Sequence, residues 1–141
     1  MGAKSVHKLS SENDTNILLF GIASHENDYR ISWALNNTIG LKFIKSENHQ
    51  SFHKRFNEMQ EFSAYTSLET EDLPMCKLIA NRCDNGFLLE ELKNIDYLLL
   101  VESGEKQLDV NLFIQQIRSI SFIATAFTIN PSSIKAINRI K

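Results

Sequence analysis

The sequence predicts an α+β fold, in which two main helices cover one face of a mostly antiparallel sheet of five or six strands. Residues 95–101 are almost continuously apolar, which suits a strand buried on both faces. Two other segments carry apolar residues at helical spacing. The elements follow in the order strand, helix, three strands, strand, helix, strand, which predicts a βαββαβ-like core with an inserted hairpin. With 141 residues, the chain is expected to form a single domain over residues 1–141.

The apolar run itself reads IDYLLLV and lies between an Asn85-Gly86 turn and Gly104. It is too short to be a helix on its own, so we expect a central strand. Asp96 enters this strand, and an unpaired carboxylate in the interior is costly. Three explanations stay open: Asp96 caps a neighbouring turn, pairs with a cation such as Arg30, or faces a pocket.

The first half of the chain supplies a buried strand and the first helix. Residues 17–23, ILLFGIA, predict the strand, and Gly21 within it indicates a close backbone approach or a bulge. Ser24 is the expected N-cap of a helix that runs from about His25 to Thr38 and stops at Gly40.

The remaining elements are shorter. A short edge strand is expected at 6–9, and further strands at 41–45, 62–68, 75–83 and 121–130; the second helix is expected at 106–119. The strands at 62–68 and 75–83 are expected to form an antiparallel hairpin, and residues 46–61 either a helical stripe or a flap. Pro131 can open a final helical turn, and the basic tail after it is expected to fray.

The first helix carries apolar residues on two sides, unlike an ordinary surface helix. Tyr29 and Trp33 are spaced i and i+4 and lie roughly opposite the expected core face, beside Arg30 and Asn36. In one interpretation the 52–59 segment covers both aromatic rings, and Arg30 pairs with Asp96 or Glu91. In the other, the aromatic side is a binding surface, because Trp, Tyr and Arg are the residues that most often anchor interfaces.

Composition excludes several classes of partner. The net charge of −2 comes from interspersed acids and bases, so nucleic acid is not predicted as a partner even though His53-Lys54-Arg55 lies between two phenylalanines. No apolar run approaches the length of a membrane span, and the N-terminal residues lack a secretory apolar region. Cys76 and Cys83 are expected to be two buried thiols in a reducing cytosol, which predicts a cytoplasmic protein.

No arrangement typical of catalysis is present in the sequence. His49 and His53 could share a helix face, but no third ligand is near them, so neither a metal nor a cofactor is predicted. The chain has no nucleophile elbow and no glycine-rich phosphate loop.

Two functions from different classes follow. The first is a non-enzymatic interaction or regulatory protein that binds an unknown protein partner through the Tyr29 and Trp33 side of the first helix. The alternative is a small ligand-binding protein or enzyme whose pocket is lined by Arg30, Glu91, Asp96 and Tyr97. The candidate binding residues are Tyr29, Arg30, Trp33, Asn36, Glu91, Asp96 and Tyr97.

Residues 89–97, LEELKNIDY, resemble the motif that names the IPExxxVDY family of small bacterial proteins. The identical positions are Glu91, Asp96 and Tyr97, and the conservative replacements are Leu89 and Ile95. Glu90 stands where the motif has its Pro. The resemblance extends to residues 6–9, 28–30 and 33–36 and to the turn at 85–86. It implies a small bacterial cytoplasmic protein and implies no particular reaction.

Overall fold

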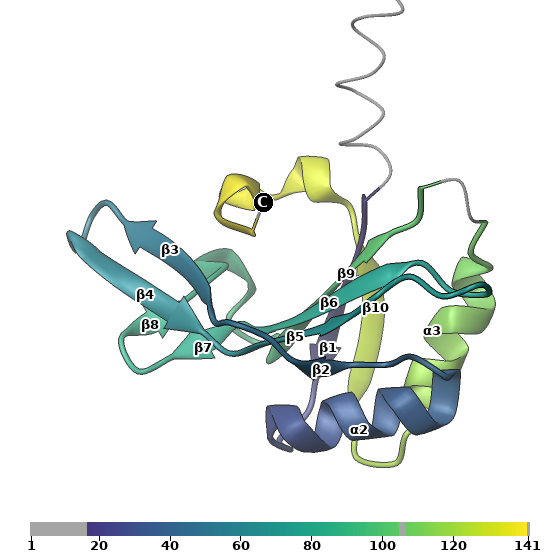
Figure 1. Cartoon of the computed structure of the whole chain (residues 1–141). Coiled ribbons are helices and arrows are strands. Elements are labelled where there is room, and N and C mark those ends of the chain that lie inside the picture. The colour runs from purple at the N-terminus through teal and green to yellow at the C-terminus, as the bar shows by residue number, and fades with distance from the viewer. Residues whose placement is uncertain (1–16, 105–106, 141) are drawn as a thin grey trace, which may run out of the picture.

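A computed structural model describes residues 17–104 and 107–140 of the chain, and it has an α+β fold (Figure 1). A six-stranded antiparallel sheet has the strand order β10-β1-β9-β6-β5-β2, and two separate hairpins, β3-β4 and β7-β8, extend from it. The sheet strands are β1 (Ile17–Ala23), β2 (Ile44–Lys45), β5 (Ala64–Ser67), β6 (Met75–Ala80), β9 (Tyr97–Glu102) and β10 (Thr125–Ile129). The hairpin strands are β3 (His49–His53), β4 (Glu58–Phe62), β7 (Arg82–Cys83) and β8 (Gly86–Phe87).

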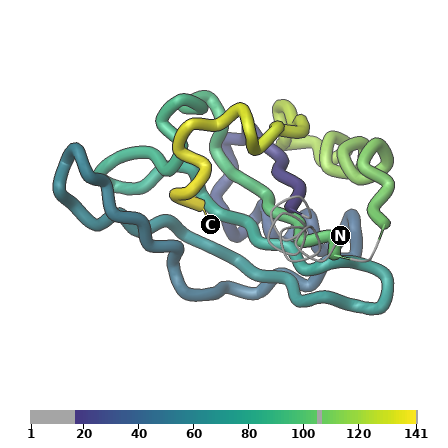
Figure 2. Tube along the Cα trace, turned by 90° about the horizontal axis from the view of Figure 1, so that it is seen from above, coloured from purple at the N-terminus to yellow at the C-terminus, as the bar shows by residue number. Residues whose placement is uncertain are grey.

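The helices are α2 (Asp28–Ile39) and α3 (Val110–Arg118), and three short 3-10 turns are η1 (Glu90–Leu92), η2 (Pro131–Ser133) and η3 (Ile137–Ile140). Both α-helices lie on the same face of the sheet, as Figure 1 shows. The opposite face is covered by residues 88–95 and by the C-terminal turns, which cross over the sheet in Figure 2. The chain therefore forms three layers, with the sheet in the middle.

The strand β9 is the centre of the sheet, because it pairs with β1 on one side and β6 on the other. Its alternate side chains enter two different cores. Tyr97, Leu99 and Val101 pack under the helices, whereas Leu98 and Leu100 pack under the C-terminal layer. Burial on both faces explains the continuous apolar run, and the predicted central strand is confirmed. Gly21 of β1 lies close to this strand's entrance: a Cβ there would be 2.7 Å from the Ile95 Cδ1 atom.

Helix α2 starts three residues later than predicted. Its N-cap is Asn27, whose side chain accepts a hydrogen bond from the Arg30 backbone N–H at 2.9 Å. Ser24 is not the cap: its hydroxyl accepts from the Glu26 N–H and donates to the Phe122 carbonyl within the turn that precedes the helix. The C-terminal end is as predicted: Gly40 has φ of 94°, and its N–H donates to the Asn36 carbonyl.

The flap, the β5-β6 pair and the C-terminal segment differ in how closely they follow the predictions from the sequence. Residues 46–61 form a flap, since most of that segment belongs to the β3-β4 hairpin. The predicted hairpin of 62–68 and 75–83 exists as the β5-β6 pair, although it belongs to the main sheet, and Pro131 opens η2. The expectation of a frayed tail is wrong, because Ile134 and Ile140 are buried and Arg139 forms several hydrogen bonds. The edge strand expected at 6–9 lies outside the described residues.

Both cysteines are free thiols, but only Cys76 is fully buried, whereas Cys83 is half-buried. Burial raises the pKa of the Cys76 thiol to about 12. Cys83 belongs to β7, a separate hairpin strand, so the two thiols do not share one strand as the sequence suggested.

Candidate functional site

The exposed side of α2 carries the aromatic residues that the sequence singles out. Tyr29 is 65 % exposed and Trp33 is 54 % exposed, and they are neighbours one helical turn apart. We call Tyr29, Arg30 and Trp33 the α2 aromatic face. The interpretation in which the 52–59 segment covers these rings is wrong: Phe52 and Met59 are themselves about half exposed, and their hairpin extends away from α2 (Figure 1).

The rest of α2 fixes the direction of this face. Ile31, Ala34 and Leu35 are buried against the sheet, whereas Tyr29, Arg30 and Trp33 point to solvent. Asn36, another predicted binding residue, has its side chain committed to the chain itself: its amide donates to the Phe43 carbonyl at 3.2 Å and its carbonyl oxygen accepts from the Phe43 N–H at 2.8 Å. Asn36 thus holds the segment after the helix and is not available to a ligand.

Arg30 pairs with neither Asp96 nor Glu91. Its Nε atom lies 3.6 Å from Glu26, one turn earlier, and its guanidinium lies 4.9 Å from the centre of the Phe122 ring. Half of the Arg30 side chain stays exposed. Its position next to Trp33 on an exposed face leaves it within reach of a partner, because an exposed ion pair of this kind contributes little to stability.

Asp96 has two partners, and these resolve the alternatives that the sequence leaves open. One carboxylate oxygen accepts from the Ser24 N–H at 2.8 Å, and the other accepts from Arg82 at 2.6 Å. The residue therefore caps the turn after β1 and pairs with a cation, although that cation is Arg82 and not Arg30. A carboxylate with two such partners can enter the sheet without a large desolvation cost.

Tyr97 is buried at the start of β9 under the loop before α2. Its hydroxyl donates to the Glu26 carbonyl at 2.5 Å. Burial, reinforced by the negative charges of Asp28 and Asp96, raises the pKa of Tyr97 to about 12. Tyr97 thus ties the central strand to the helical layer and exposes little surface for binding.

Glu91 lies on the other side of the sheet. Its carboxylate accepts from the backbone N–H groups of Lys135 and Ala136, at 3.0 Å and 3.4 Å, in the C-terminal layer. Arg30, on α2, belongs to the helical layer. The structure therefore does not bring Arg30, Glu91, Asp96 and Tyr97 together at one concave site.

Glu91 does line a cleft of about 600 Å³, at a place that the sequence does not indicate. The cleft lies between the β3-β4 hairpin, η1 and the C-terminal segment. Its lining comprises Ser51, Phe52, His53, Lys54, Arg55, Leu88, Glu90, Glu91, Lys135, Ala136, Asn138 and Arg139. We call it the hairpin cleft.

A buried histidine and a glutamate meet in this cleft, as they do at many active sites. The His53 Nε2 atom lies 3.2 Å from Glu90, whose carboxylate also contacts Arg55 at 3.5 Å. The other ring nitrogen, Nδ1, accepts from the Phe56 N–H at 3.2 Å. Because Nδ1 accepts a hydrogen bond, Nε2 is the nitrogen that bears the hydrogen, and it donates a hydrogen bond to Glu90. Both ring nitrogens are thus engaged within the chain, and the pair joins the hairpin to η1.

Sequence reasoning missed two residues that organise these surfaces. Asn81 is completely buried, and its side chain donates to the Leu92 and Ile95 carbonyls while accepting from the Leu89 N–H. Arg139 donates to Ser51, Gln60 and the carbonyls of Phe87 and Leu88. Asn81 could have been found as a polar residue at the end of an apolar strand. The burial of the segment that carries Arg139 could have been found from three isoleucines spaced three residues apart, Ile134, Ile137 and Ile140.

No group of three or more His, Cys, Asp or Glu side chains that could hold a metal ion occurs in residues 17–104 and 107–140. In the same part of the chain, no helix has the length and apolar character needed to cross a membrane. No family model matches the chain, and neither a curated protein nor a solved structure does.

Proposed function

We propose that this protein is a non-enzymatic interaction module that binds a partner protein through the α2 aromatic face. The observation that carries the proposal is the exposure of Tyr29 and of the chain's only Trp, side by side on a helix whose opposite side is buried. Large aromatic side chains are costly to leave in water, and with an adjacent Arg they form the residue set that most often dominates binding energy.

The chemistry of this face indicates what the partner must offer. The Tyr29 hydroxyl and the Trp33 indole N–H form no hydrogen bond with any described residue, so both are free to donate. Arg30 adds a half-exposed cation. A complementary surface would hold an apolar pocket for the two rings and, at its rim, carbonyl or carboxylate oxygens for the three donors.

The β3-β4 hairpin also exposes apolar side chains, and it provides a matched control. Phe52 and Met59 are cross-strand partners and are exposed to nearly the same degree as Trp33. Replacing them by Ala removes a similar amount of exposed apolar surface from another element. A loss of binding confined to the α2 variant would locate the partner surface on the helix.

The experiment is affinity purification from the native host with the wild-type chain, Tyr29→Ala/Trp33→Ala and Phe52→Ala/Met59→Ala, followed by titration of purified candidates. We expect one partner to bind the wild type and the hairpin variant, and to bind the α2 variant at least about 30-fold more weakly, as for loss of a hot spot worth about 2 kcal/mol. Analytical ultracentrifugation of the same variants identifies the case in which the partner is a second copy. The proposal fails if the α2 variant keeps every partner, or if it unfolds.

We also propose that the chain is a member of the IPExxxVDY family and acts in the cytoplasm. The family proposal rests on the sequence of residues 89–97, and the packing of that stretch gives a physical reason for its pattern. Leu89 and Ile95 are fully buried, Asp96 caps a turn, and Tyr97 binds the helical layer. Two free thiols support a reducing compartment.

A further inference from the structure

The hairpin cleft is positively charged in a protein that is negatively charged overall. Four lining side chains are cationic and two are anionic, which gives the lining a net charge of +2 with His53 neutral, against −2 for the whole chain. Local charge of one sign in a concave site concentrates ligands of the opposite sign. The volume of about 600 Å³ lies within the range of small-molecule sites.

The two carboxylates of the cleft are already satisfied. Glu90 contacts Arg55 and accepts from His53, and Glu91 accepts from two backbone N–H groups. Both keep their negative charge, which the net charge of +2 includes, but the oxygens that make these bonds are not free to bind a cation. Arg139 is committed as well, since its guanidinium donates to four groups of the chain.

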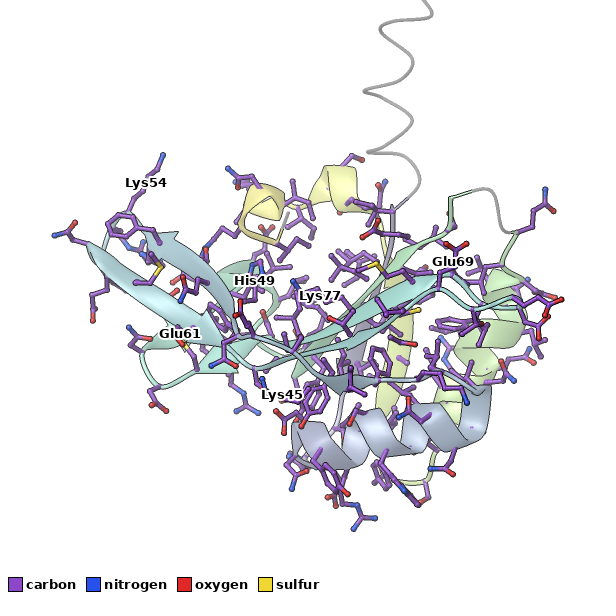
Figure 3. All side chains as sticks on the ribbon, in the orientation of Figure 1. Lys45, His49, Lys54, Glu61, Glu69 and Lys77 are labelled. Atoms are coloured by element: carbon purple, nitrogen blue, oxygen red, sulfur yellow. The ribbon has the colours of Figure 1, made fainter. Side chains whose placement is uncertain are left out.

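Three donors of the lining remain uncommitted. The ammonium groups of Lys54 and Lys135 and the side-chain amide of Asn138 have no hydrogen-bond or ion-pair partner among the described residues. Lys54 comes from the tip of the hairpin, where Figure 3 shows it extending toward the side on which the C-terminal turns lie. Lys135 and Asn138 come from those turns. Donors from two separate elements thus line the same space, beside the apolar residues Leu88 and Ala136.

We propose that the hairpin cleft binds a small molecule through a dianionic phosphate group, held by Lys54, Lys135 and Asn138. A phosphate monoester carries a charge near −2 at neutral pH, which matches the net charge of the lining. Lysine binds phosphate as a point charge and needs no fixed bidentate geometry. Ala136 and Leu88 supply the apolar part of the lining, against which an organic part of the same ligand can pack. This inference is independent of the α2 aromatic face.

The probes are adenosine monophosphate, inorganic phosphate and adenosine, each titrated calorimetrically into the full chain at low salt. The variants are Lys54→Met and Lys135→Met. Lys42→Met is the matched control, because it removes the same charge from an exposed position that does not line the cleft. The phosphate-bearing probes should bind the wild type and the control equally, and about tenfold more weakly to each cleft variant. Binding should also weaken as salt is raised.

The relative affinity of the probes distinguishes the two sources of phosphate. Tighter binding of the nucleotide than of inorganic phosphate supports a phosphate carried by an organic molecule, and equal binding supports free phosphate. The proposal is overturned if neither phosphate-bearing probe binds at millimolar concentration, if adenosine binds as tightly as its monophosphate, or if Lys42→Met weakens binding as much as the cleft variants do.

Discussion

Asn81 shows how one buried side chain can hold a whole turn in place. It lies just after β6, where its side chain and backbone together bind five groups between Leu88 and Asp96. The bonds fix η1 and the approach to the central strand. Each buried backbone group in that turn would otherwise lack a partner, and such a group costs about 1–3 kcal/mol.

We therefore expect Asn81→Ala to lower the free energy of unfolding by about 3 kcal/mol, because the Leu89 N–H and two carbonyls lose their partner while remaining buried. Urea unfolding measures the effect. Asn94→Ala, at an exposed position of the same stretch, is the control and should change stability by less than about 0.5 kcal/mol. Equal stabilities for the two variants would show that the turn does not depend on Asn81.

His49 provides a pH-dependent contribution at the same scale. Burial lowers the pKa of His49 below its ordinary value of 6.5, and its Nε2 atom lies 2.6 Å from the Arg139 carbonyl. As the pH falls below about 6.5, the unfolded chain binds a proton that the folded chain resists binding. The contribution of neutral His49 to the free energy of unfolding should therefore be fully present above about pH 6.5 and should decrease as the pH falls below that value.

The measurement is urea unfolding of the wild type, His49→Gln and His25→Gln at about pH 7.5 and about pH 5.5. The loss of stability between the two conditions should shrink in His49→Gln and persist in His25→Gln, whose position is exposed. An unchanged loss in His49→Gln would assign the pH dependence to other groups.

At the scale of elements, the β3-β4 hairpin inverts the usual pattern of a strand pair. Its inward side chains include the buried polar residues Ser51, His53 and Gln60, whereas Phe52 and Met59 point outward. A half-buried strand is normally recognised by apolar residues at its inward positions. Here those positions are largely polar, so the alternation of the sequence did not predict either strand. The same inversion gives the hairpin cleft its polar floor.

The C-terminal segment was hidden for a related reason. Its basic residues suggested a solvated tail, but Ile134 and Ile140 are buried, and the Arg139 guanidinium donates to groups in the β3-β4 hairpin and to the Phe87 and Leu88 carbonyls. Burial lowers the pKa of Arg139, yet four acceptors surround the group and keep it satisfied. The long-range partners of a charged side chain cannot be assigned from local sequence.

Arg139→Met should loosen both elements at once. Ser51, Gln60 and two carbonyls lose a donor, so we expect a loss of about 2 kcal/mol and faster amide exchange in β3, β4 and the C-terminal turns. Arg55→Met, at a position 70 % exposed, should change stability by less than about 0.5 kcal/mol. Unchanged exchange in Arg139→Met would mean that the isoleucines alone hold the segment.

At the scale of the whole molecule, the fold was largely predictable because buried strands and helices leave a regular pattern of apolar residues in the sequence. The central strand carries apolar residues on both faces, and α2 and α3 each carry one apolar side that packs on the sheet. These patterns fix the sheet and its helical layer. The second covering layer lacks such a pattern, since it consists of short 3-10 turns and a loop, and the hairpin cleft depends on that layer.

The candidate site was predictable only in part. The position of the aromatic side of α2 followed from helical periodicity. Its exposure did not, because the sequence left open whether residues 52–59 cover the two rings, and only the structure shows them exposed. The proposed pocket of Arg30, Glu91, Asp96 and Tyr97 required the mutual positions of three elements. The sheet separates Glu91 from Arg30. The local sequence around Glu91 does not show which face of the sheet this loop covers.

The central claim is that the α2 aromatic face is open to solvent in the free chain, and the chain's only Trp allows a direct measurement. Iodide quenching of intrinsic fluorescence reports the accessibility of Trp33 alone. The structure, with Trp33 54 % exposed, predicts emission typical of a hydrated indole and strong quenching, unchanged by Phe52→Ala/Met59→Ala. Emission shifted to shorter wavelength that iodide does not quench in the isolated protein would show that Trp33 is covered, and would contradict the account.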